Sequence, residues 1–140
     1  MLKHIDPVLS GVLLKALDEM GHGEKLALVD RNYPSRPSGA PVIHLGEIGI
    51  VRAATALFSV FPLDTFISHP LARMQADDQS PAHDTHLGVL EAASAEHPHP
   101  LEFEVIERPK FYEAAKECSL IVQCLEQAPY SCFIAQKGVV

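Results

Sequence analysis

Apolar residues among the first 20 positions follow the spacing of a helix. They recur three and four residues apart, which places them on one helical face: Leu9, Val12, Leu13, Ala16, Leu17 and Met20. Ser10 suits the N-cap of this helix. Gly21 suits a left-handed residue just past its end, because glycine adopts a positive φ without a Cβ clash. The unbroken apolar run at residues 26–29 then predicts a strand that is covered on both faces.

Helical and strand patterns alternate along the rest of the chain. Helical spacing predicts further helices at residues 49–60, 84–95 and 109–117. Short apolar or β-branched runs predict strands at residues 42–45, 65–68, 103–106, 119–124 and 132–136. The run at 71–75 either continues the strand before it or forms a separate one. Strands interleaved with helices indicate an α/β fold, so we expect residues 1–140 to form a single domain of three layers, α/β/α, around a central, largely parallel (mixed) sheet.

The composition narrows the class of protein. Hydrophobic residues make up 47% of the chain, which favours a folded globular domain. Eleven basic residues against 18 acidic ones give a formal charge of -7, with no basic stripe, so we expect no nucleic-acid partner. We find neither a signal-like N-terminus nor an apolar run of membrane-spanning length, and therefore expect a cytoplasmic protein with no membrane partner. The three cysteines lack Cys-x-x-Cys spacing and are expected to be reduced thiols.

The common chemical motifs are missing. The pairs His83-x-x-His86 and His97-x-His99 have no further ligands nearby in the sequence, and zinc sites need three or four, so we predict no metal. Nucleotide binding and serine hydrolysis lack support, because no Gly-x-Gly-x-x-Gly, P-loop or Gly-x-Ser-x-Gly occurs. Cys118 and Cys124 flank a predicted strand and suit core positions, whereas Cys132 follows a Tyr-Ser turn at the mouth of a strand.

Four residues remain as candidates for chemistry without a cofactor. His22 leaves the first helix at its negative end, where the helix dipole favours an imidazolium, and Asp30 ends the strand that follows. We expect these two side chains at one edge of the sheet. With Arg108 and Tyr130 they would move protons and bind hydroxyls, which suits a neutral polyol better than a phosphate. The simpler alternative is that His22 is a solvated loop residue and Asp30 a turn former.

Four stretches of the sequence resemble the L-fucose mutarotase and D-ribose pyranase family. They are residues 19–24, with Met-Gly-His-Gly, residues 30–34, residues 106–115, and Tyr130 with residues 137–139. The resemblance runs along the chain in matching order and is weakest from about residue 70 to 100. It implies a small cytoplasmic α/β protein that needs no cofactor and interconverts the cyclic forms of a free monosaccharide. It also implies a homo-oligomer, either a pentameric ring or a decamer of stacked rings.

Within the family, the residue pattern favours the fucose mutarotase branch. Ribose pyranases usually have histidine at the position of Arg108 and lack the Met-Gly-His-Gly form of the first motif. The resemblance implies that His22 is the proton donor, that Asp30 accepts from sugar hydroxyls, and that Arg108 contacts substrate. It assigns further contacts to the turn at Tyr130, with Ser131 and Cys132 beside it, and Tyr130 is a second candidate for proton exchange.

One departure from the family leaves the choice of sugar open. The tyrosine is usually followed by a small residue and an asparagine, whereas this chain has Ser131 and Cys132. An amide offers donors and an acceptor, and a thiol offers only weak ones. The predicted substrate is therefore L-fucose or a related sugar. A D-ribose pyranase activity and a non-catalytic sugar-binding or transport-accessory role remain as alternatives.

Overall fold

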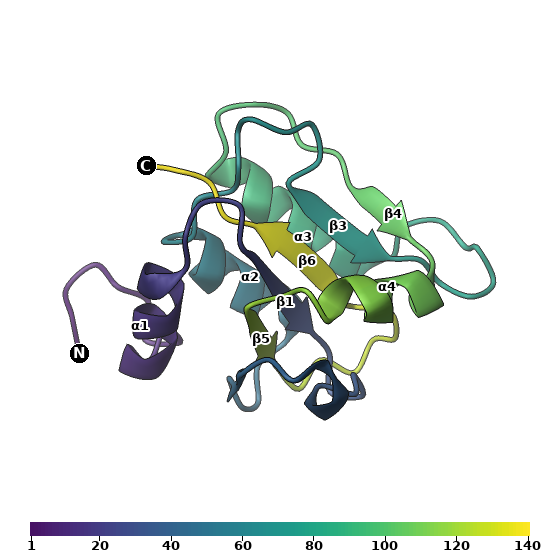
Figure 1. Ribbon diagram of the computed structural model, residues 1–140, viewed down its shortest axis with the longest axis horizontal. Helices are drawn as coiled ribbons and strands as arrows, with labels where there is room; N and C mark the ends of the chain where they lie inside the picture. Colours follow the sequence, from purple (N-terminus) through teal and green to yellow (C-terminus); the bar gives the residue numbers. More distant parts are fainter.

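A six-stranded mixed sheet organises the computed structural model, which describes residues 1–140 (Figure 1). Across the sheet, the strands lie in the order β2 (Val42–His44), β5 (Leu120–Gln123), β1 (Lys25–Val29), β6 (Phe133–Gln136), β3 (Leu71–Met74) and β4 (Glu104–Ile106). Pairing is parallel except for β6, which runs antiparallel to both β1 and β3. The carboxyl ends of the other five strands therefore share one edge with the amino end of β6. We refer to this as the carboxyl edge and to the opposite one as the amino edge.

Helices cover both faces of the sheet, which confirms the three predicted layers. Helices α1 (Gly11–Glu19), α2 (Ile50–Phe58) and α3 (Asp84–Ala95) pack on one face, and α4 (Arg108–Ala115) packs on the other (Figure 1). Strand β1 contributes Leu26 and Leu28 to the first core and Ala27 and Val29 to the second. Burial on both faces explains why its sequence is apolar without alternation. None of the helices has the length and apolar composition needed to cross a bilayer.

The start of α1 is the one predicted from the sequence, whereas the conformation after its end differs from the prediction. Ser10 is the N-cap, and its Oγ accepts a hydrogen bond from Leu13 N at 3.3 Å. The prediction that Gly21 is left-handed is wrong, because the helix ends at Met20 in an extended conformation with φ −66°. The left-handed residue is Gly23, with φ 85°, in the turn that enters β1.

The predicted strand at residues 65–68 is also wrong. This segment is a series of bends, in which Phe66 is 70% exposed. The side chain of Asp64 accepts a hydrogen bond from Phe66 N at 2.9 Å, and this local turn takes the chain away from the sheet. The run at 71–75 is a strand of its own, β3. The other predicted helices and strands are confirmed to within a few residues at their ends.

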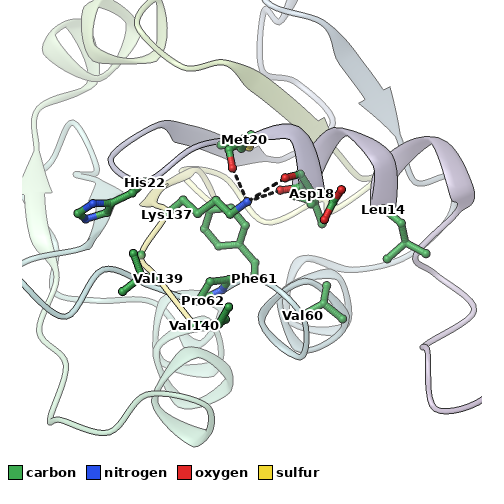
Figure 2. A pocket seen from close by; sticks show the side chains of 12 residues that line it. Leu14, Asp18, Met20, His22, Val60, Phe61, Pro62, Lys137, Val139 and Val140 are labelled. Atoms are coloured by element: carbon green, nitrogen blue, oxygen red, sulfur yellow. Dashed lines mark hydrogen bonds between the residues drawn. The ribbon is translucent and has the colours of Figure 1, made fainter.

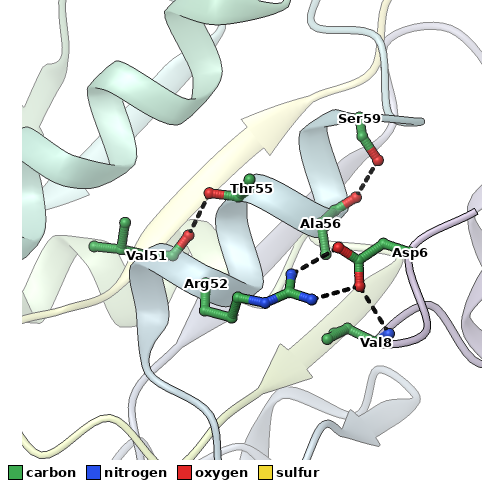
Figure 3. Close-up of polar contacts among 7 residues, drawn as sticks. All are labelled: Asp6, Val8, Val51, Arg52, Thr55, Ala56 and Ser59. Atoms are coloured by element: carbon green, nitrogen blue, oxygen red, sulfur yellow. Dashed lines mark hydrogen bonds and ion pairs between the residues drawn. The ribbon is translucent and has the colours of Figure 1, made fainter.

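An ion pair fastens the segment before α1 to the helix α2 (Figure 3). Both terminal nitrogens of the Arg52 guanidinium donate to the two carboxylate oxygens of Asp6, each at 2.7 Å. Asp6 also accepts from Val8 N at 2.9 Å. Hydrogen bonding to Arg52 lowers the pKa of Asp6 below its ordinary value. Since the pair is partly exposed, it orients the segment more than it stabilises the fold.

We expect Gly138→Ala to destabilise the protein. A Cβ at this position would lie 2.6 Å from the carbonyl oxygen of Leu63 and 2.8 Å from Asp64 Cα, so the backbone would have to move. Overpacking of this kind costs about 1–3 kcal/mol in the free energy of unfolding. Urea denaturation at one fixed protein concentration would measure it. The control is Gly11→Ala in α1, where an added Cβ meets nothing within 4 Å. Equal stability of the two variants would contradict the prediction.

Candidate active site

His22 lies at the amino edge, where a buried carboxylate holds its ring. The Nε2 atom is 3.1 Å from Oδ2 of Asp64, and the side chains are 44% and 3% exposed respectively. Gln136 Nε2 donates to the same oxygen at 2.9 Å. The backbone N–H of Phe66, with these donors, lowers the pKa of Asp64 below its ordinary value. An ionised carboxylate only accepts hydrogen bonds, so Nε2 of His22 carries a hydrogen and Nδ1 is the atom free to exchange a proton.

A hollow of about 520 Å³ opens beside His22 (Figure 2). Its walls come mainly from α1, the segment that follows α2 and the C-terminal residues, including Leu14, Met20, Val60, Phe61 and Val139. Within it, Lys137 Nζ donates to the carbonyl oxygens of Leu17, at 2.7 Å, and of Met20. The lysine ammonium therefore caps the negative end of α1, the place that the sequence suggested for His22. The imidazole is left to pair with Asp64.

Asp30 lies at the carboxyl edge, at the other end of β1. The register of β1 on β6 sets Lys25 opposite Gln136 and Leu28 opposite Phe133. A strand of five residues spans about 17 Å. The expectation that His22 and Asp30 meet at one edge is therefore wrong within a single chain. The reason is that one residue precedes β1 and the other follows it, so the whole strand separates them.

Buried contacts define the position of the Asp30 carboxylate. The residue is 6% exposed, and its Oδ1 accepts from Asn32 N at 2.9 Å. The Cys132 thiol donates to Oδ2 at 3.4 Å. Burial raises the pKa of Asp30, against the effect of these hydrogen bonds. Burial, followed by the nearby Asp30 charge, raises the pKa of Cys132 well above its ordinary value. Cys132 is thus a neutral donor here and not a nucleophile.

Arg108 and the Tyr130 turn lie at the same edge as Asp30. Arg108 begins α4, and its Nε donates to both carboxylate oxygens of Asp77, at 2.9 and 3.0 Å. The guanidinium also lies over the ring of Tyr112, 5.9 Å from its centroid. Tyr130 has a positive φ of 60°, and Ser131 is fully buried. Three of the predicted site residues, Tyr130, Ser131 and Cys132, therefore follow one another in this turn. Asp30 contacts the turn through Cys132, and Arg108 lies on α4.

Two residues that support the site were missed by the sequence analysis. Gln123, at the end of β5, donates to the carbonyl oxygens of Asp30, at 2.9 Å, and Tyr33, at 3.1 Å. Its Oε1 accepts from Ser35 Oγ at 2.8 Å, so Gln123 holds the loop that follows Asp30. The signal for Gln123 in the sequence is a polar residue at the end of an otherwise apolar strand. Asp64 belongs to no sequence motif, and only its contact with His22 in the structure shows that it supports the site.

The arrangement offers two kinds of chemistry at two edges. The amino edge provides a histidine that is oriented by an ionised carboxylate, which suits proton transfer. The carboxyl edge provides a carboxylate, a guanidinium and a phenol, which suit hydroxyl groups. No three or more His, Cys, Asp or Glu side chains converge as metal ligands would.

Comparisons with known proteins match this chain along almost its whole length. The L-fucose mutarotase of Actinobacillus pleuropneumoniae serotype 5b (strain L20) is 35% identical over 143 residues, covering 99% of this chain and 97% of the relative. The L-fucose mutarotase of Histophilus somni (strain 2336) is 36% identical with the same coverage. The crystal structure of the fucose mutarotase of Streptococcus pneumoniae in complex with L-fucose has a TM-score of 0.91 at 29% identity, with 99% of each chain covered.

A more distant structure shares the fold. RbsD of Bacillus subtilis, complexed with D-ribose, has a TM-score of 0.78 at 22% identity, covering 100% of this chain and 99% of the other. Residues 3–140 match the family described as the RbsD / FucU transport protein family. The mixed six-stranded sheet is thus the fold of a known group, and the chain belongs to the RbsD / FucU family.

Proposed function

We propose that this protein is a monosaccharide mutarotase that interconverts the anomers of L-fucose or a closely related sugar. The observation that carries the proposal is the His22–Asp64 pair, in a chain that is 35% identical over nearly its full length to an L-fucose mutarotase. A fucose mutarotase structure with L-fucose bound superimposes with a TM-score of 0.91, which supports the same class of substrate. The proposed activity is that of a cytoplasmic enzyme acting on free sugars.

Acid–base chemistry by side chains accounts for the reaction. A proton from His22 Nδ1 is transferred to the ring oxygen while a second group or a water molecule accepts the anomeric hydroxyl proton. The ring opens to the aldehyde, the C1–C2 bond rotates, and the ring closes on the other face. Asp64 stabilises the imidazolium form between turnovers, since its carboxylate is ionised. A positioned acid or base contributes roughly 10²–10⁴ in rate.

The carboxyl edge would bind the sugar. Asp30 accepts hydrogen bonds from neighbouring hydroxyls, and Tyr130 donates a further one or exchanges a proton. The Nε atom of Arg108 is occupied by Asp77, which leaves the terminal guanidinium nitrogens to donate to sugar hydroxyls. Ser131 and Cys132 complete the turn.

We infer a shared site between copies of the chain. His22 and Asp30 lie at opposite ends of β1, about 17 Å apart along the strand, so one monosaccharide cannot contact both in one chain. A ring in which His22 of one copy faces the carboxyl edge of the next brings the two halves together. The exposed ring of Phe66, edge-on to His22 at 5.4 Å between centroids, suits burial in such an interface. A pentameric ring, single or stacked as a decamer, is the proposed assembly.

The first experiment tests the reaction itself. We expect the wild type to enhance anomer exchange, measured by NMR saturation transfer at the anomeric protons of L-fucose, D-ribose and a panel of related sugars. His22→Ala should lose roughly 10²–10⁴ of that enhancement, because the proton donor is gone. The control is His44→Ala, at an exposed histidine of β2. No enhancement for any sugar would leave a sugar-binding protein, and a larger effect on D-ribose than on L-fucose would favour the pyranase alternative.

A second experiment tests the shared site. We expect His22→Ala and Asp30→Asn each to be inactive alone, and their co-expression to restore about one quarter of the wild-type exchange. In randomly mixed rings, about one site in four receives an intact His22 from one copy and an intact Asp30 from the next. Asp30→Asn co-expressed with Arg108→Ala is the matched control, since both changes lie in the same half and should not complement. No recovery in the first mixture would contradict the shared site.

A third experiment tests the role of Cys132 in the choice of sugar. We expect Cys132→Asn to raise the rate for L-fucose relative to the other sugars of the panel by about tenfold, because the amide adds hydrogen-bonding groups worth about 1–1.5 kcal/mol beside Asp30. Cys132→Ser retains a single donor to Asp30 and serves as the control. Saturation transfer across the same panel measures both. An unchanged order of sugars in Cys132→Asn would count against a role of this residue in specificity.

A further inference from the structure

The N-terminal turn of α3 holds the turn that carries Tyr130. His86 Nε2 lies 2.9 Å from the carbonyl oxygen of Tyr130, and Thr85 Oγ1 lies 2.8 Å from Ser131 Oγ. The ring of His83 lies edge-on to the Tyr130 ring, with 6.4 Å between centroids. Three contacts therefore connect one end of α3 to the two residues that precede Cys132.

The hydrogen bonds of His86 identify its protonation state. The residue is fully buried, with 0% of its surface exposed. Its Nδ1 accepts from the backbone N–H of His83 at 3.0 Å, so Nδ1 carries no hydrogen. The hydrogen is on Nε2, which donates to the Tyr130 carbonyl. Only the neutral ring with this tautomer makes both bonds, because protonation would place two N–H groups against each other at Nδ1.

The Tyr130 backbone needs an external contact to keep its conformation. Its φ of 60° is in the left-handed region, which costs a residue with a Cβ roughly 1–2 kcal/mol. The direction of its carbonyl group follows from that conformation. The bond from His86 fixes the carbonyl, and it thereby also fixes the direction in which the chain continues into Ser131 and Cys132.

We propose that His86 is a positioning residue of the sugar site, whose neutral imidazole holds the Tyr130 turn in its substrate-binding conformation and whose protonation releases it. The proposal rests on the function proposed above. It adds a residue that does not touch the sugar and acts through Tyr130 and Ser131. It also gives the site a dependence on pH that does not arise from the proton transfer by His22.

The surroundings of His86 favour its neutral form. His83 stacks on it from the same helix end, with 5.0 Å between centroids and 12° between planes. Phe133 of β6 lies edge-on at 5.8 Å, and Arg73 of β3 contributes a buried positive charge. Burial lowers the pKa of His86, and the charges of Arg73 and His83 lower it further, against the effect of the Tyr130 carbonyl.

The sign of the pH effect follows from this direction. The pKa of His86 is lower in the folded protein than its ordinary value of 6.5 in an unfolded chain. The stability that His86 contributes is therefore complete above about pH 6.5 and is lost as the pH falls toward the folded pKa. In the folded protein His86 is protonated, and the Tyr130 turn released, only as the pH falls through this lowered pKa, so anomer exchange should decline there, below about pH 6.5.

A pair of substitutions separates positioning from simple packing. His86→Gln can donate to Tyr130 and accept from His83 without titrating, whereas His86→Leu fills the space and makes neither bond. We expect His86→Leu to lower anomer exchange at least about tenfold at pH 7.5, the loss of a hydrogen bond worth about 1.4 kcal/mol. His86→Gln should retain exchange at pH 7.5 and should keep a larger fraction of it than the wild type as the pH falls below 6.5, because the lowered pKa of His86 lies below that value. His97→Gln, in the loop after α3, is the control and should retain the wild-type profile.

The outcomes distinguish this proposal from the proposed function. The role of His86 is refuted if the wild type enhances exchange and His86→Leu enhances it equally. It is also refuted if His86→Gln loses exchange at low pH to the same extent as the wild type. In both cases the proposed mutarotase activity stands. If the wild type enhances exchange with no sugar, the proposed function fails, and His86 has no reaction to support. Circular dichroism and the assembly state of each variant are measured in parallel. If His86→Leu does not fold, the pH profile of His86→Gln alone decides.

Discussion

The antiparallel strand β6 is the element on which both halves of the proposed site depend. It lies between β1 and β3, and its two ends reach opposite edges of the sheet. At the carboxyl edge, Cys132 just before the strand donates to Asp30. At the amino edge, Gln136 donates to Asp64, which holds His22, and the next residue, Lys137, caps α1. A shift of β6 by one residue would exchange the faces of its side chains and disturb both edges together.

Two carboxylates of the same chain are tuned in opposite directions by their partners. Asp64 accepts from a backbone N–H, from Gln136 and from His22, and its pKa is lowered. Asp30 accepts from backbone N–H groups and from the weak Cys132 thiol, but the cost of burial outweighs these bonds, and its pKa is raised. Asp64 therefore suits the support of an imidazolium charge, whereas Asp30 suits a group that gains hydrogen bonds when hydroxyls reach it. The environment, rather than the residue type, separates the two roles.

Local pattern predicted most of the fold and only part of the site. Periodicity identified the helices and the buried strands, because α1 buries one apolar side and β1 is buried on both faces, as their sequences imply. It failed at Thr65–Ser68, where the turn at Asp64 overrides a β-branched run. It also failed to separate His22 from Asp30, since nearness in sequence says little once a strand lies between two residues. Asp64 and Gln123 support the site through contacts with residues far away in the sequence, which no local pattern encodes.

The polar groups of the carboxyl edge are largely engaged before any sugar binds. Cys132 donates to Asp30, and Arg108 Nε donates to Asp77. Positive and negative side chains come close to balance there, because Arg31 follows Asp30 and Lys110 pairs with Glu107. The groups left to a ligand are the remaining carboxylate lone pairs and the terminal guanidinium N–H groups of Arg108. Acceptors and donors placed side by side in this way suit hydroxyl groups, each of which both donates and accepts.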